Sequence, residues 1–273
     1  MKFFKNLFNS LFNSSKEQPE ERESAGVKNI IGAGYYDRME YEKAVEWWRK
    51  GAALDYDEES QVSKYYLAMC YLHGTGVEKS YEKSIMWLRD PAEHGLPEAQ
   101  YWLGVFYNSG VVVEKSYKEA ERWFRMAAEQ GLDEGQNALA WCYYEGKGVT
   151  QSYEESVKWW RKAAEQGYAD AQHHLGCRYE YGEGVQQSYT EAAKWFRKAA
   201  EQGHAYAQHS LALCYSAGHG VEQSEEEAIK WWHKSAEQGN ICAQASLEQT
   251  LKSKKDKKGK KKNKKKSKKK SKN

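Results

Sequence analysis

The sequence predicts an all-α solenoid, in which one helix hairpin repeats along the chain. The first observation behind this prediction is a leucine that recurs every 36 residues, at Leu67, Leu103, Leu139, Leu175, Leu211 and Leu247. The second is a tryptophan that recurs with the same spacing, at Trp87, Trp123, Trp159, Trp195 and Trp231. A fixed period of this length is typical of repeat architectures, in which each unit packs mainly on its neighbours.

The first half of each unit predicts a helix. In the unit that begins at Ala171, Leu175, Gly176 and Tyr179 follow at offsets 4, 5 and 8, which places all four on one helix face. We expect the small residue at offset 5 to let a neighbouring backbone approach. The turn at 182–185, Gly-Glu-Gly-Val, contains two glycines that allow positive φ and reverse the chain.

The second half of each unit predicts another helix, which begins at a serine. Glutamate follows three residues after Ser116, Ser152, Ser188 and Ser224. This is the spacing of a capping box, in which the two side chains reciprocally satisfy free amide groups. The predicted apolar face consists of Ala192, Trp195, Phe196, Ala199 and Ala200, and Gly203 ends the helix. Because neither helix buries its apolar stripe alone, the units must stack.

Three positions depart from the pattern: Pro91, Val112 and Glu225, which replaces the tyrosine that follows the capping serine in other units. Pro91 falls inside a second helix, and we expect it to bend or shorten that helix. Val112 replaces the second turn glycine, so this turn is expected to differ from the others. After Ala243 only a first helix remains, to about Leu251, and we expect it to cap the stack.

The units resemble the Sel1-like repeat, a relative of the tetratricopeptide repeat. The resemblance rests on Ala-x-x-x-Leu-Gly-x-x-Tyr, on Gly-x-Gly-Val and on Ala-x-x-Trp-(Phe/Trp)-Arg-Lys-Ala-Ala-Glu-Gln-Gly, and it covers roughly residues 63–251. It implies a right-handed α-α superhelix that scaffolds protein complexes and is not generally enzymatic. Some secreted members carry a disulfide within each unit, whereas this chain lacks a cysteine pair per unit.

The pattern divides the chain into four segments. Residues 1–23 are an N-terminal amphipathic segment and linker, 24–62 a degenerate first repeat, 63–251 five full repeats with a capping helix, and 252–273 a disordered lysine-rich tail. Apolar residues in the first segment recur at helical spacing: Phe3, Phe4, Leu7, Phe8, Leu11 and Phe12. They are consistent with a helix lying on a membrane or with one packing on the first unit.

The tail concentrates positive charge. Residues 252–273 hold 15 of the 42 basic residues and one of the 39 acidic residues, so the rest of the chain is net acidic. The lysines between Lys252 and Lys272 are suited to non-specific contact with nucleic acid or an anionic membrane. Folding back on the acidic body and a purely solubilising role are the alternatives.

The variable positions predict a binding site. Offsets 3 and 6 of the first helices vary between units and lie opposite the repeated face, on the predicted concave side. We expect these positions to form a groove for an extended peptide or helix: Tyr66, Met69, Trp102, Val105, Trp141, His174, Cys177 and Leu213. The alternative is that the rings pack against adjacent helices.

Chemistry-bearing motifs are absent. The sequence has no C-x-x-C or H-E-x-x-H, and its Gly-x-Gly-Val lacks the strand of a phosphate loop. The adjacent His173 and His174 are expected to point to different sides of a helix. We expect no metal, no cofactor and no catalysis, and five cysteines acting as small buried residues.

These observations predict a non-catalytic adaptor that binds protein through the concave face of the solenoid. The absence of paired cysteines favours a reducing compartment, so we expect a cytoplasmic monomer, with contact at the membrane periphery as an option. The alternative function is a tether to anionic membrane or nucleic acid, anchored by the tail and the N-terminal segment.

Overall fold

The computed structural model describes residues 24–54 and 58–270, with side chains placed as far as Lys255. The described residues form thirteen α-helices and no strand, which confirms the predicted all-α solenoid of helix hairpins. The predicted amphipathic segment at 1–23 lies outside the described residues.

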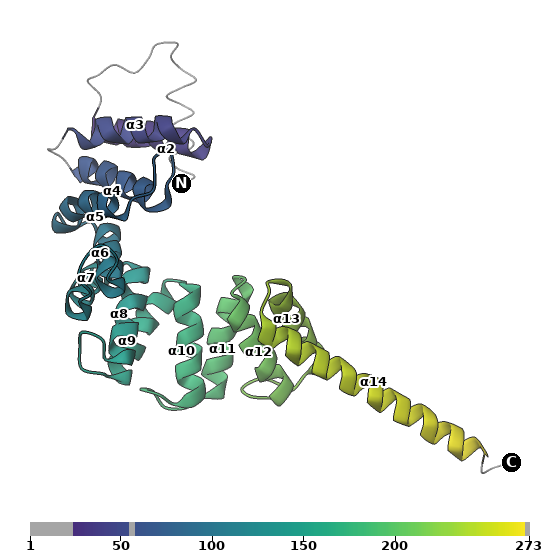
Figure 1. Cartoon of the computed structure of the whole chain (residues 1–273). Helices are drawn as coiled ribbons and strands as arrows, with labels where there is room; N and C mark the ends of the chain where they lie inside the picture. Colours follow the sequence, from purple (N-terminus) through teal and green to yellow (C-terminus); the bar gives the residue numbers. More distant parts are fainter. Residues whose placement is uncertain (1–23, 55–57, 271–273) are drawn as a thin grey trace. The chain divides into compact units, whose positions relative to one another are not determined.

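The chain divides into two compact units, one ending at Gln151 and one beginning at Ser152. In the first unit each helix packs on the next in chain order (Figure 1): α2 (Ala25–Asp37), α3 (Tyr41–Ala52), α4 (Glu58–His73), α5 (Tyr81–Glu93), α6 (Pro97–Ser109), α7 (Tyr117–Glu129) and α8 (Asp133–Glu145). Helices α2 and α3 form a hairpin, and they lie in the segment that the sequence pattern predicts to be a degenerate first repeat.

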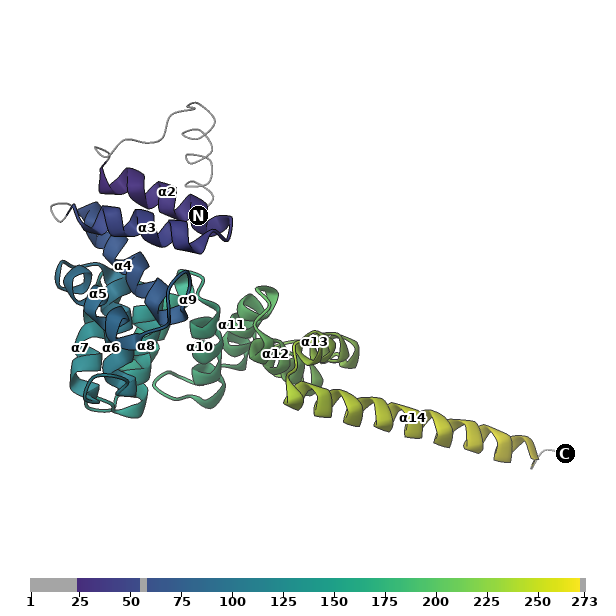
Figure 2. The ribbon, with the colours of Figure 1, turned by 45° about the horizontal axis from the view of Figure 1, so that its top comes forward.

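The second unit continues the same pattern. Its helices are α9 (Tyr153–Glu165), α10 (Ala169–Tyr181), α11 (Tyr189–Glu201), α12 (Ala205–Ala217), α13 (Glu225–Glu237) and α14 (Ile241–Lys270). Again each helix packs on the next, and α14 runs far past the end of α13 (Figure 2).

The apolar faces are buried as predicted. On α11, Trp195 is 5% exposed and Phe196 is fully buried, together with the three alanines of that face. The space at offset 5 is used differently from the prediction. A Cβ at Gly176 would lie 2.6 Å from the Phe196 ring, so an aromatic side chain rather than a backbone occupies this room. The close backbone approach occurs at the turn instead, where a Cβ on Gly184 would lie 2.2 Å from the carbonyl oxygen of Tyr153.

Only half of the predicted capping box forms. The Ser188 hydroxyl accepts a hydrogen bond from the Glu191 amide at 3.3 Å, as predicted. The Ser188 amide, however, donates to the carbonyl of Tyr179 at 2.9 Å, which ties the start of α11 to the end of α10. Because that amide already has an acceptor, the Glu191 carboxylate pairs forward with Lys194.

The predictions for Pro91 and Val112 need correction. Helix α5 contains Pro91 and still spans 13 residues, the length of α7, so the proline does not shorten it. Val112 has a φ of +71°, close to the +69° of its turn counterpart Gly184, so the turn keeps the same conformation. A β-branched residue in this region is strained, and the strain is a cost that the repeat geometry imposes on Val112.

Two sets of side-chain hydrogen bonds link successive helices. In the first set, Gln172 donates to the carbonyl of Ala164 on the preceding helix and accepts from Gln202 at 2.8 Å. In the second set, an arginine of a second helix donates to a tyrosine hydroxyl of the next helix, as Arg161 does to Tyr179 at 2.8 Å. The same bonds recur in other repeats, so the helix spacing is set by polar as well as apolar contacts.

The last helix differs from the predicted disordered tail at 252–273. Ala243 and Leu247 of α14 are buried, as a capping helix requires. The helix then continues without a break to Lys270, well past the predicted end at Leu251. Lysine has a high helix propensity, and the packed first turns supply the nucleus from which the helix extends.

Candidate functional site

A cavity of about 510 Å³ lies within the first unit and is lined by side chains from α2, α3, α4, α6 and α8. Three of the predicted site residues, Tyr66, Met69 and Trp102, line it together. They come from two different repeats, α4 and α6, as the concave-strip hypothesis requires. Because most of its wall is aromatic and acidic, we call this space the aromatic cavity.

The aromatic wall is built from rings that pack on one another. Trp48 of α3 stacks on Tyr66 with ring centres 4.9 Å apart, and Tyr66 packs beside Tyr65 at 5.7 Å. Helix α6 forms another part of the wall, where the rings of Trp102 and Tyr101 lie with their centres 5.6 Å apart. Trp48 is buried, and the other four rings are half-buried, so the rings pack on neighbours and still line an open space. That the strip binds a partner stays a prediction.

The wall also contains three acidic residues. Asp37, Glu98 and Glu134 line the cavity from three different helices, and among the described residues the lining contains neither lysine nor arginine. One carboxylate oxygen of Glu98 is buried without a hydrogen-bond partner. Burial, and then the charge of Glu98, raise the pKa of Tyr65 to about 12. A hydrogen bond with Asp133 and burial raise the pKa of Glu134 to about 7.

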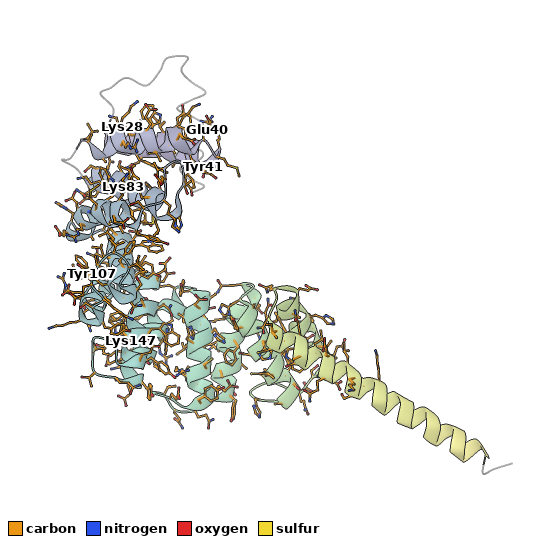
Figure 3. All side chains as sticks on the ribbon, in the orientation of Figure 1. Lys28, Glu40, Tyr41, Lys83, Tyr107 and Lys147 are labelled. Atoms are coloured by element: carbon orange, nitrogen blue, oxygen red, sulfur yellow. The ribbon has the colours of Figure 1, made fainter. Side chains whose placement is uncertain are left out.

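A second cavity, of about 380 Å³, holds two further predicted residues. Val105 of α6 and Trp141 of α8 both line it, and Lys147, labelled in Figure 3, lies in the turn after α8 and also contributes to its wall. Trp141 packs against Tyr144 edge to face, with ring centres 5.5 Å apart. The strip in the first unit therefore borders two cavities rather than one continuous groove.

The other predicted site residues lie in the second unit and line neither of the two cavities. His174 packs on Trp160 at 5.3 Å, and Leu213 is 43% exposed. The rings of His173 and His174 lie 5.3 Å apart but contact different helices. His174 packs on Trp160 of α9, whereas His173 packs on Phe196 of α11 at 5.7 Å, in line with the prediction that they point to different sides of α10. Burial lowers the pKa of His173 to about 4 and that of His174 to about 3, so both stay neutral near pH 7.

The cysteines divide into two groups. Cys70, Cys142 and Cys214 are buried free thiols, as predicted, and burial raises the pKa of each to about 12. Cys177 is half-buried, and its sulfur lies 3.7 Å from His173 Nε2. Cys242 is exposed at the start of α14, so the prediction of a buried role fails there.

No group of three or more His, Cys, Asp or Glu side chains suited to hold a metal ion occurs in the part of the chain that the structure describes. Over the same residues, no helix combines the length and apolar character that a bilayer-spanning segment needs.

Sequence reasoning missed several residues of the aromatic cavity. Tyr65 and Tyr101 occupy offset 2, which also varies between units, but only offsets 3 and 6 were expected to face a partner. Glu98 and Glu134 occupy the position just before the first repeated alanine or glycine of their units. A comparison of these two positions along the chain would have revealed both the rings and the carboxylates.

The chain is built of stacked helix hairpins, and the aromatic cavity lies between the first helices of hairpins in the first unit. Stacked hairpins of this kind are the architecture of an α-solenoid repeat protein. The chain belongs to the Sel1 repeat family, whose repeat matches residues 32–56, 62–90, 97–132, 133–168, 169–204 and 205–240. Repeats of this family generally mediate protein–protein interactions. No curated protein matches the chain.

Solved structures with this fold include two with substantial sequence identity. One is c5321, a protective antigen present in uropathogenic Escherichia coli strains, with 34% identity and a TM-score of 0.74 over 89% of this chain and 50% of the antigen. The chain thus spans half the length of that antigen. The other is a Sel1 repeat protein from Oxalobacter formigenes, with 31% identity and a TM-score of 0.71 over 81% of this chain and 86% of that protein. The immunity protein Pa5087 from Pseudomonas aeruginosa, 19% identical with a TM-score of 0.50 over 78% of this chain and 83% of its own, shares the fold alone.

Proposed function

We propose that the protein is a non-catalytic adaptor, which binds a partner protein through the first-helix strip of its first unit. The observation that carries this proposal is the aromatic cavity, where Tyr66 and Met69 of one repeat and Trp102 of the next line one space. Partly exposed aromatic residues around a concave space are the usual anchors of a protein interface. The second cavity, with Val105 and Trp141, extends this surface along the unit.

The remaining features of the proposal follow from the sequence. We place the protein in the cytoplasm, a reducing compartment, because it lacks a cysteine pair in each unit. We also propose that it acts as a monomer. It requires no metal and no cofactor in this role. In the second unit, taken by itself, the same strip positions are His174, Cys177 and Leu213, and we propose them as partner-contacting residues of that unit.

The test is a pull-down from cell extract with the full chain at low and high salt. We expect a partner to be retained at high salt and to be lost when Trp102 and Trp141 are both changed to serine. The matched control changes Tyr181 and Tyr206 to serine, since these exposed rings lie outside the strip. Retention by the Trp102/Trp141 variant would refute the adaptor proposal, provided its circular-dichroism spectrum is that of a folded helical protein.

The second candidate is a tether to anionic membrane or nucleic acid, supported by the lysines from Lys252 to Lys272 on and beyond the long α14. Such binding is electrostatic and weakens steeply with salt. In the same pull-down, the tether predicts material that is recovered at low salt, is lost at high salt and does not depend on Trp102 or Trp141.

A further inference from the structure

We propose that the aromatic cavity binds the guanidinium group of an arginine side chain that a partner protein inserts into it. The proposal rests on the adaptor function and specifies the chemistry that the partner presents. It follows from three observations, which are the charge of the cavity, its rings, and a buried arginine at the equivalent position of another repeat.

The charge of the cavity favours a cation. The carboxylates of Asp37, Glu98 and Glu134 come from α2, α6 and α8 and share one largely apolar space. Glu98 has a buried oxygen without a hydrogen-bond partner, which is costly for a charged group. A bound cation supplies that missing partner and offsets the repulsion among the three acids.

The rings favour a planar cation. The stacked pair of Trp48 and Tyr66 forms one part of the wall, and Trp102 forms another. Cations are attracted to the faces of such rings, tryptophan most strongly. A guanidinium group is flat, weakly hydrated and carries a fork of donors for a carboxylate, whereas an ammonium group is strongly hydrated. Arginine therefore fits a cavity of stacked rings and carboxylates better than lysine does.

The second unit contains the same arrangement filled by the protein itself. Arg178 of α10 is buried, its guanidinium lies 5.6 Å from the ring centre of Trp160, and it pairs with Glu183. Arg178 lies 108 residues, or three repeat periods, after Cys70 and occupies the equivalent position of its repeat. Trp160 corresponds in the same way to Trp48 but lies 112 residues after it, because the first repeat is four residues longer than the others.

Both of those counterparts line the aromatic cavity. The shorter Cys70 leaves open the space that Arg178 fills in its own repeat. We infer that a partner's arginine takes the place of the missing side chain, with Glu98 in the role that Glu183 has beside Arg178. This equivalence also distinguishes the aromatic cavity from the second cavity, where Phe124 takes the position of Trp160.

The experiment titrates the ¹⁵N-labelled full chain with N-acetyl-arginine amide and follows the indole signals of Trp48 and Trp102 by NMR. The matched ligand is N-acetyl-citrulline amide, which has the same shape without the charge. We expect the arginine derivative to shift both signals and the citrulline derivative to shift neither. Equal shifts with both ligands, or none with arginine, overturn the proposal.

Two variants test the binding site. Glu98→Gln should weaken binding roughly tenfold, because a charged hydrogen bond is lost. Glu114→Gln removes an exposed carboxylate outside the cavity and should leave the affinity unchanged. Cys70→Arg should fill the cavity from within and abolish binding, whereas Cys70→Ala should retain it. Unchanged binding by the Cys70→Arg variant contradicts the proposal even if Glu98→Gln fails to fold.

The outcome also separates this proposal from the adaptor function. Tighter binding of N-acetyl-lysine amide than of the arginine derivative points to a partner that presents lysine and overturns the arginine proposal. If no ligand binds while partner capture still depends on Trp102 and Trp141, the adaptor stands and the arginine proposal falls. If arginine binds but partner capture does not depend on either tryptophan, the adaptor surface is wrong, whereas the guanidinium site in the cavity stands.

Discussion

The two buried histidines of α10 predict a loss of stability in mild acid. Burial lowers the pKa of His173 to about 4 and of His174 to about 3, from an ordinary 6.5, and the positive charge of Arg178 acts in the same direction on both. His204 also faces His173 at 5.0 Å, and it pairs with Asp170 at 3.0 Å. Below pH 6.5 the unfolded chain takes up two protons that the folded chain does not.

The sign and size of the effect follow from this difference in bound protons. Stability is complete above pH 6.5 and falls as the pH drops toward 4, because protons bind the unfolded state first. Each pH unit is worth about 1.4 kcal/mol for each such group, so the 1.5 units between pH 6.5 and pH 5 cost about 2 kcal/mol for each histidine. For the pair, we expect a loss of about 4 kcal/mol at pH 5.

Urea unfolding followed by circular dichroism at pH 7 and pH 5 measures this loss. The variant changes His173 to asparagine and His174 to alanine, the residues that α8 carries at the same offsets as Asn137 and Ala138. The pH dependence of this variant should be smaller by the full amount. Changing the exposed His233 to asparagine is the control and should alter nothing. If wild type and the double variant lose equal stability at pH 5, the histidines are not held neutral by burial.

Three further predictions concern the repeat frame. Val112→Gly should relieve the positive-φ strain and raise the free energy of unfolding by about 1–2 kcal/mol, whereas Val111→Gly should bring no gain in a thermal melt. Ser188→Ala should lower stability by about 1 kcal/mol in urea, because it removes the acceptor of the Glu191 amide. Cys242 should be the first thiol labelled by Ellman's reagent at pH 8, since it is exposed; early labelling of Cys70 instead would contradict its burial.

The repeated positions allowed the fold to be predicted, because each has one packing role that every unit reuses. Leu175 and Phe196, for example, are fully buried, and their counterparts in other repeats, such as Leu103 and Phe124, are buried as well. The turn at Val112 shows the strength of this frame, since a valine adopts the backbone conformation of a glycine there. The second arm of the capping box was not predictable, because sequence spacing does not reveal that the Ser188 amide is already bonded to Tyr179.

The candidate site was predicted only in part, for a related reason. Offsets along one helix define a face, and on that basis Tyr66, Met69 and Trp102 were placed correctly around one space. Whether such a face is open depends on side chains from other helices, such as Trp48 and Glu134, which no single-helix pattern includes. His174 illustrates the other outcome, since its equivalent space is filled by neighbours.

The comparison of Cys70 with Arg178 leads to a last prediction about the frame itself. Both residues occupy offset 7, and the hydrogen bonds from Arg49 to Tyr71 and from Arg161 to Tyr179 fix the helix spacing similarly around each. If the frame is independent of what fills the space, Cys70→Arg should remain folded, because the added side chain meets a cavity, an aromatic ring and carboxylates. Cys214→Arg should instead cost several kcal/mol, on the order of 3 or more, since Cys214 is buried like Cys70 but lines neither of the two cavities. Thermal melts of the two variants decide the matter, and equal destabilisation would mean that offset 7 tolerates no arginine in the first unit and that Cys70 is a packing residue rather than the floor of a binding site.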